Sequence, residues 1–151
     1  MKRWSDVNEA LAFAISNEEE AYRFYTDLAA RAERPWMREV FAGFAKEELG
    51  HKAKLEGVRR GKELKRSEKQ VIDLKIGDYL VDVQPTGELS YPDALVLAMK
   101  KEKAAFRLYT DIAAATEPGP LRELFLGLAQ EEAKHKLRFE VEYDEIVLRE
   151  N

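Results

Sequence analysis

Apolar residues recur at intervals of three and four in two stretches of the chain, about 6–60 and about 90–148. This interval places them on one face of an α-helix, so each stretch predicts helices with one buried side. A turn breaks each stretch once, before Pro35 in the first and at 117–120 in the second. The pattern therefore predicts two helix pairs. Residues from about 62 to 89 contain Gly77, Pro85 and Gly87, and they predict a long crossover connection.

The second helix pair repeats the sequence of the first. When residues 10–56 are aligned with residues 94–140, 22 of the 47 positions are identical. An internal duplication of this kind predicts that both helix pairs fold in the same way. The 151 residues are enough for one domain with a substantial core. We therefore expect a single all-α domain over 1–151, a four-helix bundle made from two duplicated helix pairs.

Acidic residues interrupt the apolar faces at matching positions in the two copies. Glu18 and Glu102 each lie in the middle of an apolar stripe, and the second helix of each pair carries a Glu-x-x-His sequence. Residues three apart lie on the same helix face, so a carboxylate and an imidazole at this spacing can bind one metal ion. The two histidines of the chain both lie in these sequences. Four buried carboxylates would be costly unless two divalent ions neutralised them. The predicted ligands of two metal ions are Glu18, Glu48, His51, Glu102, Glu132 and His135.

Composition excludes several other classes of protein. The net charge of −4 gives no basic surface for nucleic acid. No apolar run approaches the roughly 20 residues that span a bilayer, and the N-terminus does not resemble a signal peptide. We therefore expect no membrane association and a cytoplasmic location. The absence of cysteine excludes disulfides and iron–sulfur clusters.

The order and spacing of these motifs resemble those of a known family. The residues that carry the resemblance are Glu18-x-x-Ala21-x-x-Phe24-Tyr25, Glu47-Glu48-x-x-His51, Glu102-x-x-Ala105-x-x-Leu108-Tyr109 and Glu131-Glu132-x-x-His135. The sequence resembles the rubrerythrin branch of the ferritin-like di-iron carboxylate superfamily. This resemblance implies a ferritin-like bundle with two iron ions, and an oxidoreductase that acts on hydrogen peroxide or dioxygen.

The sequence departs from that family in two respects. Rubrerythrins proper carry a C-terminal rubredoxin domain, whereas this chain has no cysteine, so we expect electrons from a separate donor such as a rubredoxin. They also carry an extra carboxylate one turn after the third-helix glutamate. Ala105 stands there in this chain, and Ala21 is its counterpart, which predicts a symmetric site. Tyr25 and Tyr109 lie on the same stripes as Glu18 and Glu102, about two turns further on, so they could hydrogen-bond the carboxylates.

The residues leave several functions and metals open. The leading interpretation is a peroxide-reducing enzyme of oxidative-stress defence. One alternative is a ferroxidase that handles iron, and another is a metal-binding bundle without turnover. Manganese or zinc could replace iron, because carboxylate and imidazole ligands do not select one of these metals. We also expect the chain to form a homodimer.

Overall fold

The computed structural model describes residues 7–62 and 90–150, with side chains for 9–61 and 90–147. These residues form four α-helices and, in the described ranges, no β-strand. The helices are α1 (Val7–Arg31), α2 (Pro35–Lys62), α3 (Tyr91–Ala114) and α4 (Pro120–Glu150). The predicted helix pairs and their turns are therefore confirmed. The predicted crossover lies outside the described residues, apart from its first residue at the end of α2.

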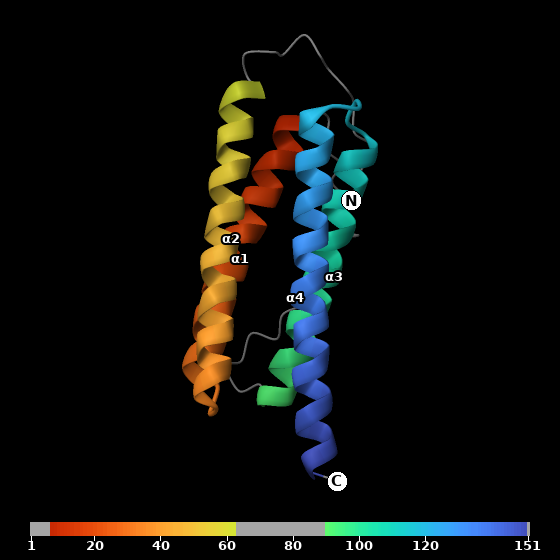
Figure 1. Cartoon of the computed structure of the whole chain (residues 1–151). Coiled ribbons are helices and arrows are strands. Elements are labelled where there is room, and N and C mark those ends of the chain that lie inside the picture. Colours follow the sequence, from red (N-terminus) through yellow and green to blue (C-terminus); the bar gives the residue numbers. More distant parts are fainter. Residues whose placement is uncertain (1–6, 63–89, 151) are drawn as a thin grey trace. The chain divides into compact units, whose positions relative to one another are not determined.

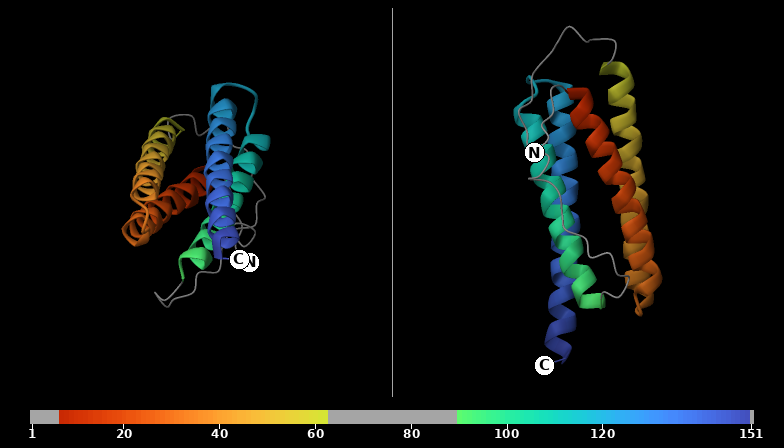
Figure 2. Two further views of the ribbon diagram at one scale, coloured as in Figure 1. Left: turned by 60° about the horizontal axis from the view of Figure 1, so that its bottom comes forward. Right: turned by 180° about the vertical axis from the view of Figure 1, so that it is seen from behind.

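The contacts divide the chain into two compact units, Met1–Ile76 and Gly77–Asn151. Unit 1 contains α1 and α2, and unit 2 contains α3 and α4. Within each unit the two helices run antiparallel and side by side, as both Figure 1 and Figure 2 show. Each unit is thus one copy of the sequence duplication, folded as a helical hairpin.

Local sequence explains where the helices of unit 2 begin and end. Ser90 precedes α3, and its hydroxyl accepts a hydrogen bond from the backbone N–H of Asp93 at 3.2 Å. Such a cap satisfies one of the amides that a helix N-terminus leaves without an internal partner. Between α3 and α4 the chain turns at Gly119, whose φ of +150° favours glycine over residues with a Cβ atom.

An arginine at the start of the second helix fastens the turn in both units. In unit 1 the Arg38 Nε donates to the carbonyl of Ala32 at 2.6 Å. In unit 2 the Arg122 Nε donates to the carbonyls of Ala113 and Thr116 at 3.0 and 2.8 Å. These carbonyls lie at the end of the preceding helix, where the regular helical hydrogen bonding stops, and the carbonyl of Ala113 also accepts from the backbone N–H of Thr116 at 3.1 Å. Arg38 and Arg122 are duplicated positions, so both copies close their hairpins by the same contact.

The apolar faces predicted from the sequence form the core of each unit. Unit 1 buries Leu11, Ala14, Tyr25, Leu28, Met37, Phe41 and Leu55, and unit 2 buries Leu95, Ala98, Leu108, Tyr109, Ile112, Phe125, Leu128 and Phe139. Phe106 of α3 follows Glu102 by four residues and so lies on the same side of the helix, but it is 39% exposed. At about 100° per residue it is roughly 40° from Glu102, while the buried arc extends from Glu102 towards Ala98. Phe106 is therefore at the edge of the buried face.

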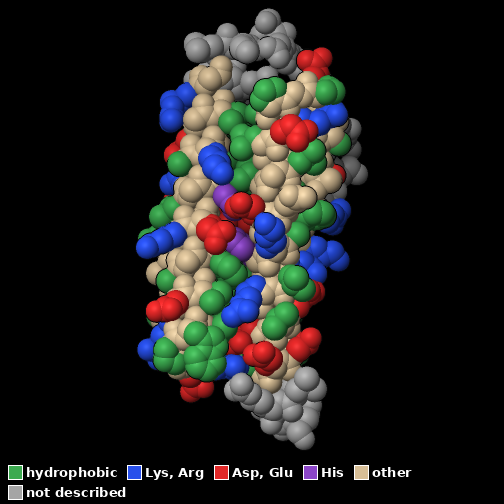
Figure 3. All heavy atoms as spheres, viewed as in Figure 1, with side chains coloured by type: hydrophobic (Ala, Val, Ile, Leu, Met, Phe, Trp, Pro, Cys, Tyr) green, Lys and Arg blue, Asp and Glu red, His purple; other side chains and the backbone are tan. Residues whose placement is uncertain are grey.

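The outer faces of the helices are strongly charged. Figure 3 shows acidic and basic side chains spread along the visible helices, with apolar side chains among them. None of the helices in the described part of the chain has a stretch long and apolar enough to cross a membrane.

Candidate metal centre

Unit 1 brings three of the predicted ligands together in its interior. Glu18 comes from α1, and Glu48 and His51 come from adjacent turns of α2; the three are between 1% and 2% exposed. His51 Nδ1 lies 2.9 Å from Glu48 Oε1 and 3.5 Å from Glu18 Oε2. One ligand atom from each residue lies within 4.8 Å of the others. We call these residues the unit 1 triad, and ligand atoms this close together could hold a metal ion.

Unit 2 repeats this arrangement with the duplicated residues. Glu102 comes from α3, and Glu132 and His135 come from α4, again between 1% and 2% exposed. His135 Nδ1 lies 3.1 Å from Glu102 Oε2 and 3.5 Å from Glu132 Oε1. We call these residues the unit 2 triad. Glu102 of α3 thus lies beside the Glu-x-x-His sequence of α4, as Glu18 of α1 lies beside that of α2.

The unit 1 triad changes the acidity of its histidine. Burial by itself lowers the pKa of His51, but hydrogen bonds and charge interactions with Glu18 and Glu48 outweigh it and raise the pKa to about 11. Without a metal, His51 therefore holds a proton that partly compensates the two carboxylates. A metal ion binds the neutral imidazole, so metal and proton compete for Nδ1, the nitrogen that faces both carboxylates.

The donor atoms of each triad fit a divalent transition metal. Two carboxylates and one imidazole suit iron, manganese and zinc, and the low exposure of all three side chains keeps bulk water from the donor atoms. Each buried triad could hold a metal ion. Ala21 and Ala105 are half-buried one turn after Glu18 and Glu102, so neither unit has an additional carboxylate at that position. Each unit thus supplies the same three ligands.

Tyr25 and Tyr109 are buried, at 0% and 1% exposure. The Tyr25 ring packs edge-on against Phe24 and Phe44, with centroids 5.5 and 6.3 Å away, and the Tyr109 ring stacks on Phe125 at 6.4 Å. Through these contacts both tyrosine rings form part of the hydrophobic core. Their predicted hydrogen bonds to the carboxylates stay a prediction.

Unit 2 also buries an acid that the sequence analysis did not identify. Glu142 is 3% exposed, and its Oε2 accepts a hydrogen bond from the Tyr91 hydroxyl at 3.0 Å. The duplication gives no signal for this pair, because the corresponding residues of unit 1 are Val7 and Val58. A signal was present in the spacing, since Glu142 lies about two helical turns after His135 and so on the same face of α4.

The chain is similar to known proteins in both sequence and structure. Residues 9–83 and 93–151 match the family model described as rubrerythrin. A hypothetical protein from Pyrococcus furiosus has a similar structure, with 25% identity, a TM-score of 0.73, and coverage of 91% of this chain and 87% of that chain. A protein from Thermotoga maritima, provisionally described as a ferritin-like diiron-carboxylate protein, gives 19% identity, a TM-score of 0.78, and coverage of 96% and 99%. No protein with curated annotation matches the chain.

These similarities confirm the predicted fold class and the predicted family. The structural match to a ferritin-like protein extends over nearly the whole chain, and the chain is all-α in its described residues. The family model matches residues from both copies of the duplication and includes all six members of the two triads. The chain belongs to the rubrerythrin family.

Proposed function

We propose that the protein is a non-haem di-iron oxidoreductase that reduces hydrogen peroxide in oxidative-stress defence. The observation that carries this proposal is that each half of a rubrerythrin-family chain buries one Glu–Glu–His triad. A buried metal site on rigid helices suits redox chemistry, because the helices hold the ligands in place while the charge of the metal changes.

The two triads together hold two iron ions in this proposal. Two divalent ions neutralise the charges of Glu18, Glu48, Glu102 and Glu132, and the imidazoles of His51 and His135 bind as neutral ligands. Each triad with its ion then has no net charge, which a buried site requires. The ligand pattern of two single glutamates and two Glu-x-x-His sequences is the one found in ferritin-like di-iron bundles.

The side chains of the triads have distinct roles in this function. The carboxylates bind and neutralise the metal, and their burial keeps bulk water from the site. The Nδ1 atoms of His51 and His135 lose any proton they hold when the metal binds. Two ferrous ions held by the triads would supply the two electrons that, with two protons, convert hydrogen peroxide to two molecules of water. Tyr25 and Tyr109 are our candidates for hydrogen-bonding the carboxylates and holding them in orientation.

The electrons for repeated turnover come from outside these 151 residues. The sequence contains no cysteine, so it has no cysteine-bound iron centre of its own. A separate donor such as a rubredoxin would reduce the ferric site after each reaction. A cytoplasmic location and a homodimer also stay part of this proposal.

The test is anaerobic mixing of the diferrous protein with one equivalent of hydrogen peroxide or of dioxygen, followed by ferric absorption. We expect faster oxidation by peroxide, one oxidation per site, and no second reaction until a reductase–rubredoxin pair or a chemical reductant is added. A control variant, His51→Ala with His135→Ala, should show no such reaction.

Two other outcomes would replace this function with another. Much faster oxidation by dioxygen, with ferric iron then leaving the protein, would indicate a ferroxidase. Stable metal binding without reaction toward either oxidant would indicate a metal-binding protein without turnover. Metal analysis of protein from its native host would decide between iron, manganese and zinc.

A further inference from the structure

The two copies of the duplication differ at a position directly beside a triad. In unit 1, Glu19 follows Glu18 on α1, and Lys52 follows His51 on α2. The corresponding residues of unit 2 are Lys103 and Lys136. One copy therefore has opposite charges beside its ligands, and the other has two positive charges.

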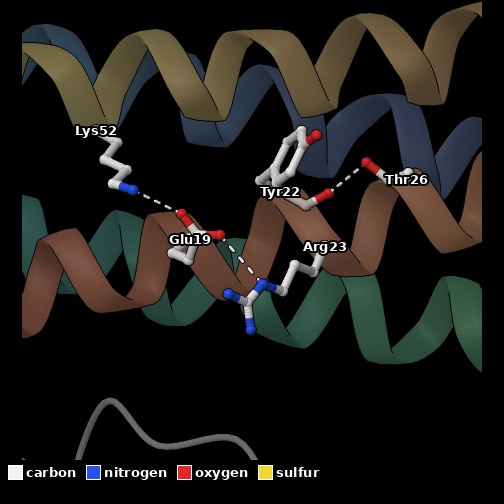
Figure 4. A network of polar contacts seen from close by, with 5 residues as sticks. All are labelled: Glu19, Tyr22, Arg23, Thr26 and Lys52. Carbon is white, nitrogen blue, oxygen red and sulfur yellow. Dashed lines mark hydrogen bonds and ion pairs between the residues drawn. The ribbon is translucent and has the colours of Figure 1, made fainter.

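The opposite charges of unit 1 form a bridge between its two helices. Lys52 Nζ donates to Glu19 Oε1 at 2.7 Å, and both side chains are 28% exposed. The other oxygen, Glu19 Oε2, accepts from Arg23 Nε at 3.1 Å, one turn along α1. Figure 4 shows Lys52 reaching from α2 to Glu19, which Arg23 approaches from the opposite side. Both carboxylate oxygens of Glu19 are thus held by cations.

Unit 2 lacks this bridge through a single difference. Lys103 and Lys136 cannot form a salt bridge with each other, and Lys136 instead donates to Glu140 on its own helix at 2.7 Å. Arg107 stands at the position that corresponds to Arg23. Unit 2 therefore has the counterparts of both cations, Arg107 and Lys136, but a lysine in place of the acid.

The Glu19–Lys52 salt bridge lies directly beside the unit 1 triad and restrains the metal ligands of that triad. Glu19 and Lys52 are each joined by one peptide bond to a member of the unit 1 triad, so the bridge limits sliding and rotation of α1 against α2 at the level of the ligands. Ligands that are already held in position lose less conformational entropy when they bind a metal. The same restraint is missing beside the unit 2 triad.

We propose that the Glu19–Lys52 bridge preorganises the unit 1 triad, so that the protein binds its two metal ions with unequal affinity and the unit 1 triad binds first. This inference rests on the proposed metal binding and adds an order of loading to it. Glu19 and Lys52 are positioning residues, because they act through Glu18 and His51 and not through contact with the metal.

The test is an anaerobic titration of the metal-free full chain with Co²⁺, followed by visible absorption and calorimetry. We expect two binding steps. The variant His135→Ala should keep the tighter step, and His51→Ala should keep only the weaker one. Glu19→Gln should weaken the tighter step about two- to fivefold, as expected for a partly exposed ion pair, and should leave the weaker step unchanged.

A substitution that introduces the acid into unit 2 provides the sharper experiment. Lys103→Glu places an acid at the position that corresponds to Glu19, and we expect it to tighten the weaker step about two- to fivefold. Lys103→Gln is the matched control, since it removes the same positive charge but cannot form the bridge. Lys52→Arg should retain the tighter step, because arginine can also pair with Glu19. The effect of Glu19→Gln should shrink in about 1 M salt, which screens charges.

Each result bears on the proposal. Two equal steps in the wild-type protein would overturn the inference and leave the proposed metal binding intact. An equal effect of Glu19→Gln on both steps would also overturn it, because a general loss of stability would act in this way. A wild-type chain that binds no Co²⁺ would overturn both the inference and the proposed function.

Discussion

Replacing Glu18 by glutamine should stabilise the metal-free protein and weaken the metal-loaded one. In unit 1 two carboxylates share one imidazole, and all three side chains are at most 2% exposed. Without a metal, the raised pKa of His51 provides one positive charge for two negative charges. Glu18→Gln leaves His51 and Glu48 as a balanced pair at 2.9 Å, with a neutral amide of the same shape nearby.

The size of each effect follows from the cost of the buried charge and from the free energy of metal binding. An incompletely compensated buried charge costs about 1–3 kcal/mol, so the variant should gain roughly this much stability in its metal-free form. For a chain of this size each kcal/mol shifts the melting temperature by roughly 2–4 °C. Metal at about 100 times its Kd adds about 2.7 kcal/mol to the wild-type protein, a shift of roughly 5–11 °C. Because Glu18→Gln removes a charged ligand, it should abolish most of the shift that comes from metal bound to the unit 1 triad.

The assay is thermal unfolding by circular dichroism, with EDTA or with saturating Fe²⁺ under nitrogen. Glu20→Gln is the control, because Glu20 is exposed on the same helix and its replacement should change stability by less than about 0.5 kcal/mol. Glu102→Gln should repeat the effect in unit 2. A metal-free Glu18→Gln protein that melts below the wild type, with an undiminished response to Fe²⁺, would refute the reasoning.

Three further predictions concern the ligands, the buried tyrosines and the turns. The wild-type chain should bind two metal ions, and His51→Ala and His135→Ala should each lower this number in metal analysis; unchanged stoichiometry in both would contradict the ligand assignment. Tyr25→Phe and Tyr109→Phe should keep the metal content but slow peroxide-dependent oxidation several-fold in stopped-flow absorption, and unaltered rates would make both residues purely structural. Arg122→Ala should lower the unfolding free energy by about 1–2 kcal/mol in urea titration, because it removes the hydrogen bonds from Arg122 to the carbonyls of Ala113 and Thr116, while Arg107→Ala should have little effect.

The sequence was sufficient to predict the fold class and the residues of the triads, because both depend on helical periodicity. A helix repeats about every 3.6 residues, so the apolar stripes that contain Leu11 and Leu95 could be predicted directly, and the glutamates within them were conspicuous. The duplication strengthened this interpretation, because an acid that recurs at the same place in both apolar stripes is difficult to explain as a surface residue. The exposure of Phe106 shows that a stripe locates the centre of a buried face more accurately than its edges.

Other features depend on contacts that the sequence pattern does not carry. The Tyr91–Glu142 pair has no counterpart in unit 1, so the duplication could not indicate it. The Glu19–Lys52 bridge joins residues 33 positions apart, and the sequence alone does not distinguish either from other charged residues of a helix surface. Only the geometry shows that they meet, since long side chains reach across helices in ways that residue type alone does not determine.

The position of each triad follows from the turn that joins its helices. In unit 1 the chain from Glu18 to Ala32 and the chain from Arg38 to His51 are almost equal in length, and Arg38 contacts Ala32. At about 1.5 Å per residue each stretch is roughly 20 Å long, so both ligands lie at nearly the same height above the turn. Unit 2 has the same lengths, from Glu102 to Thr116 and from Arg122 to His135. The turn sequences differ, as Arg34-Pro35-Trp36 corresponds to Pro118-Gly119-Pro120, yet the arginine contact is the same. In each hairpin, two helical stretches of nearly equal length meet at the arginine contact, and this equality brings a glutamate on one helix beside a histidine on the other.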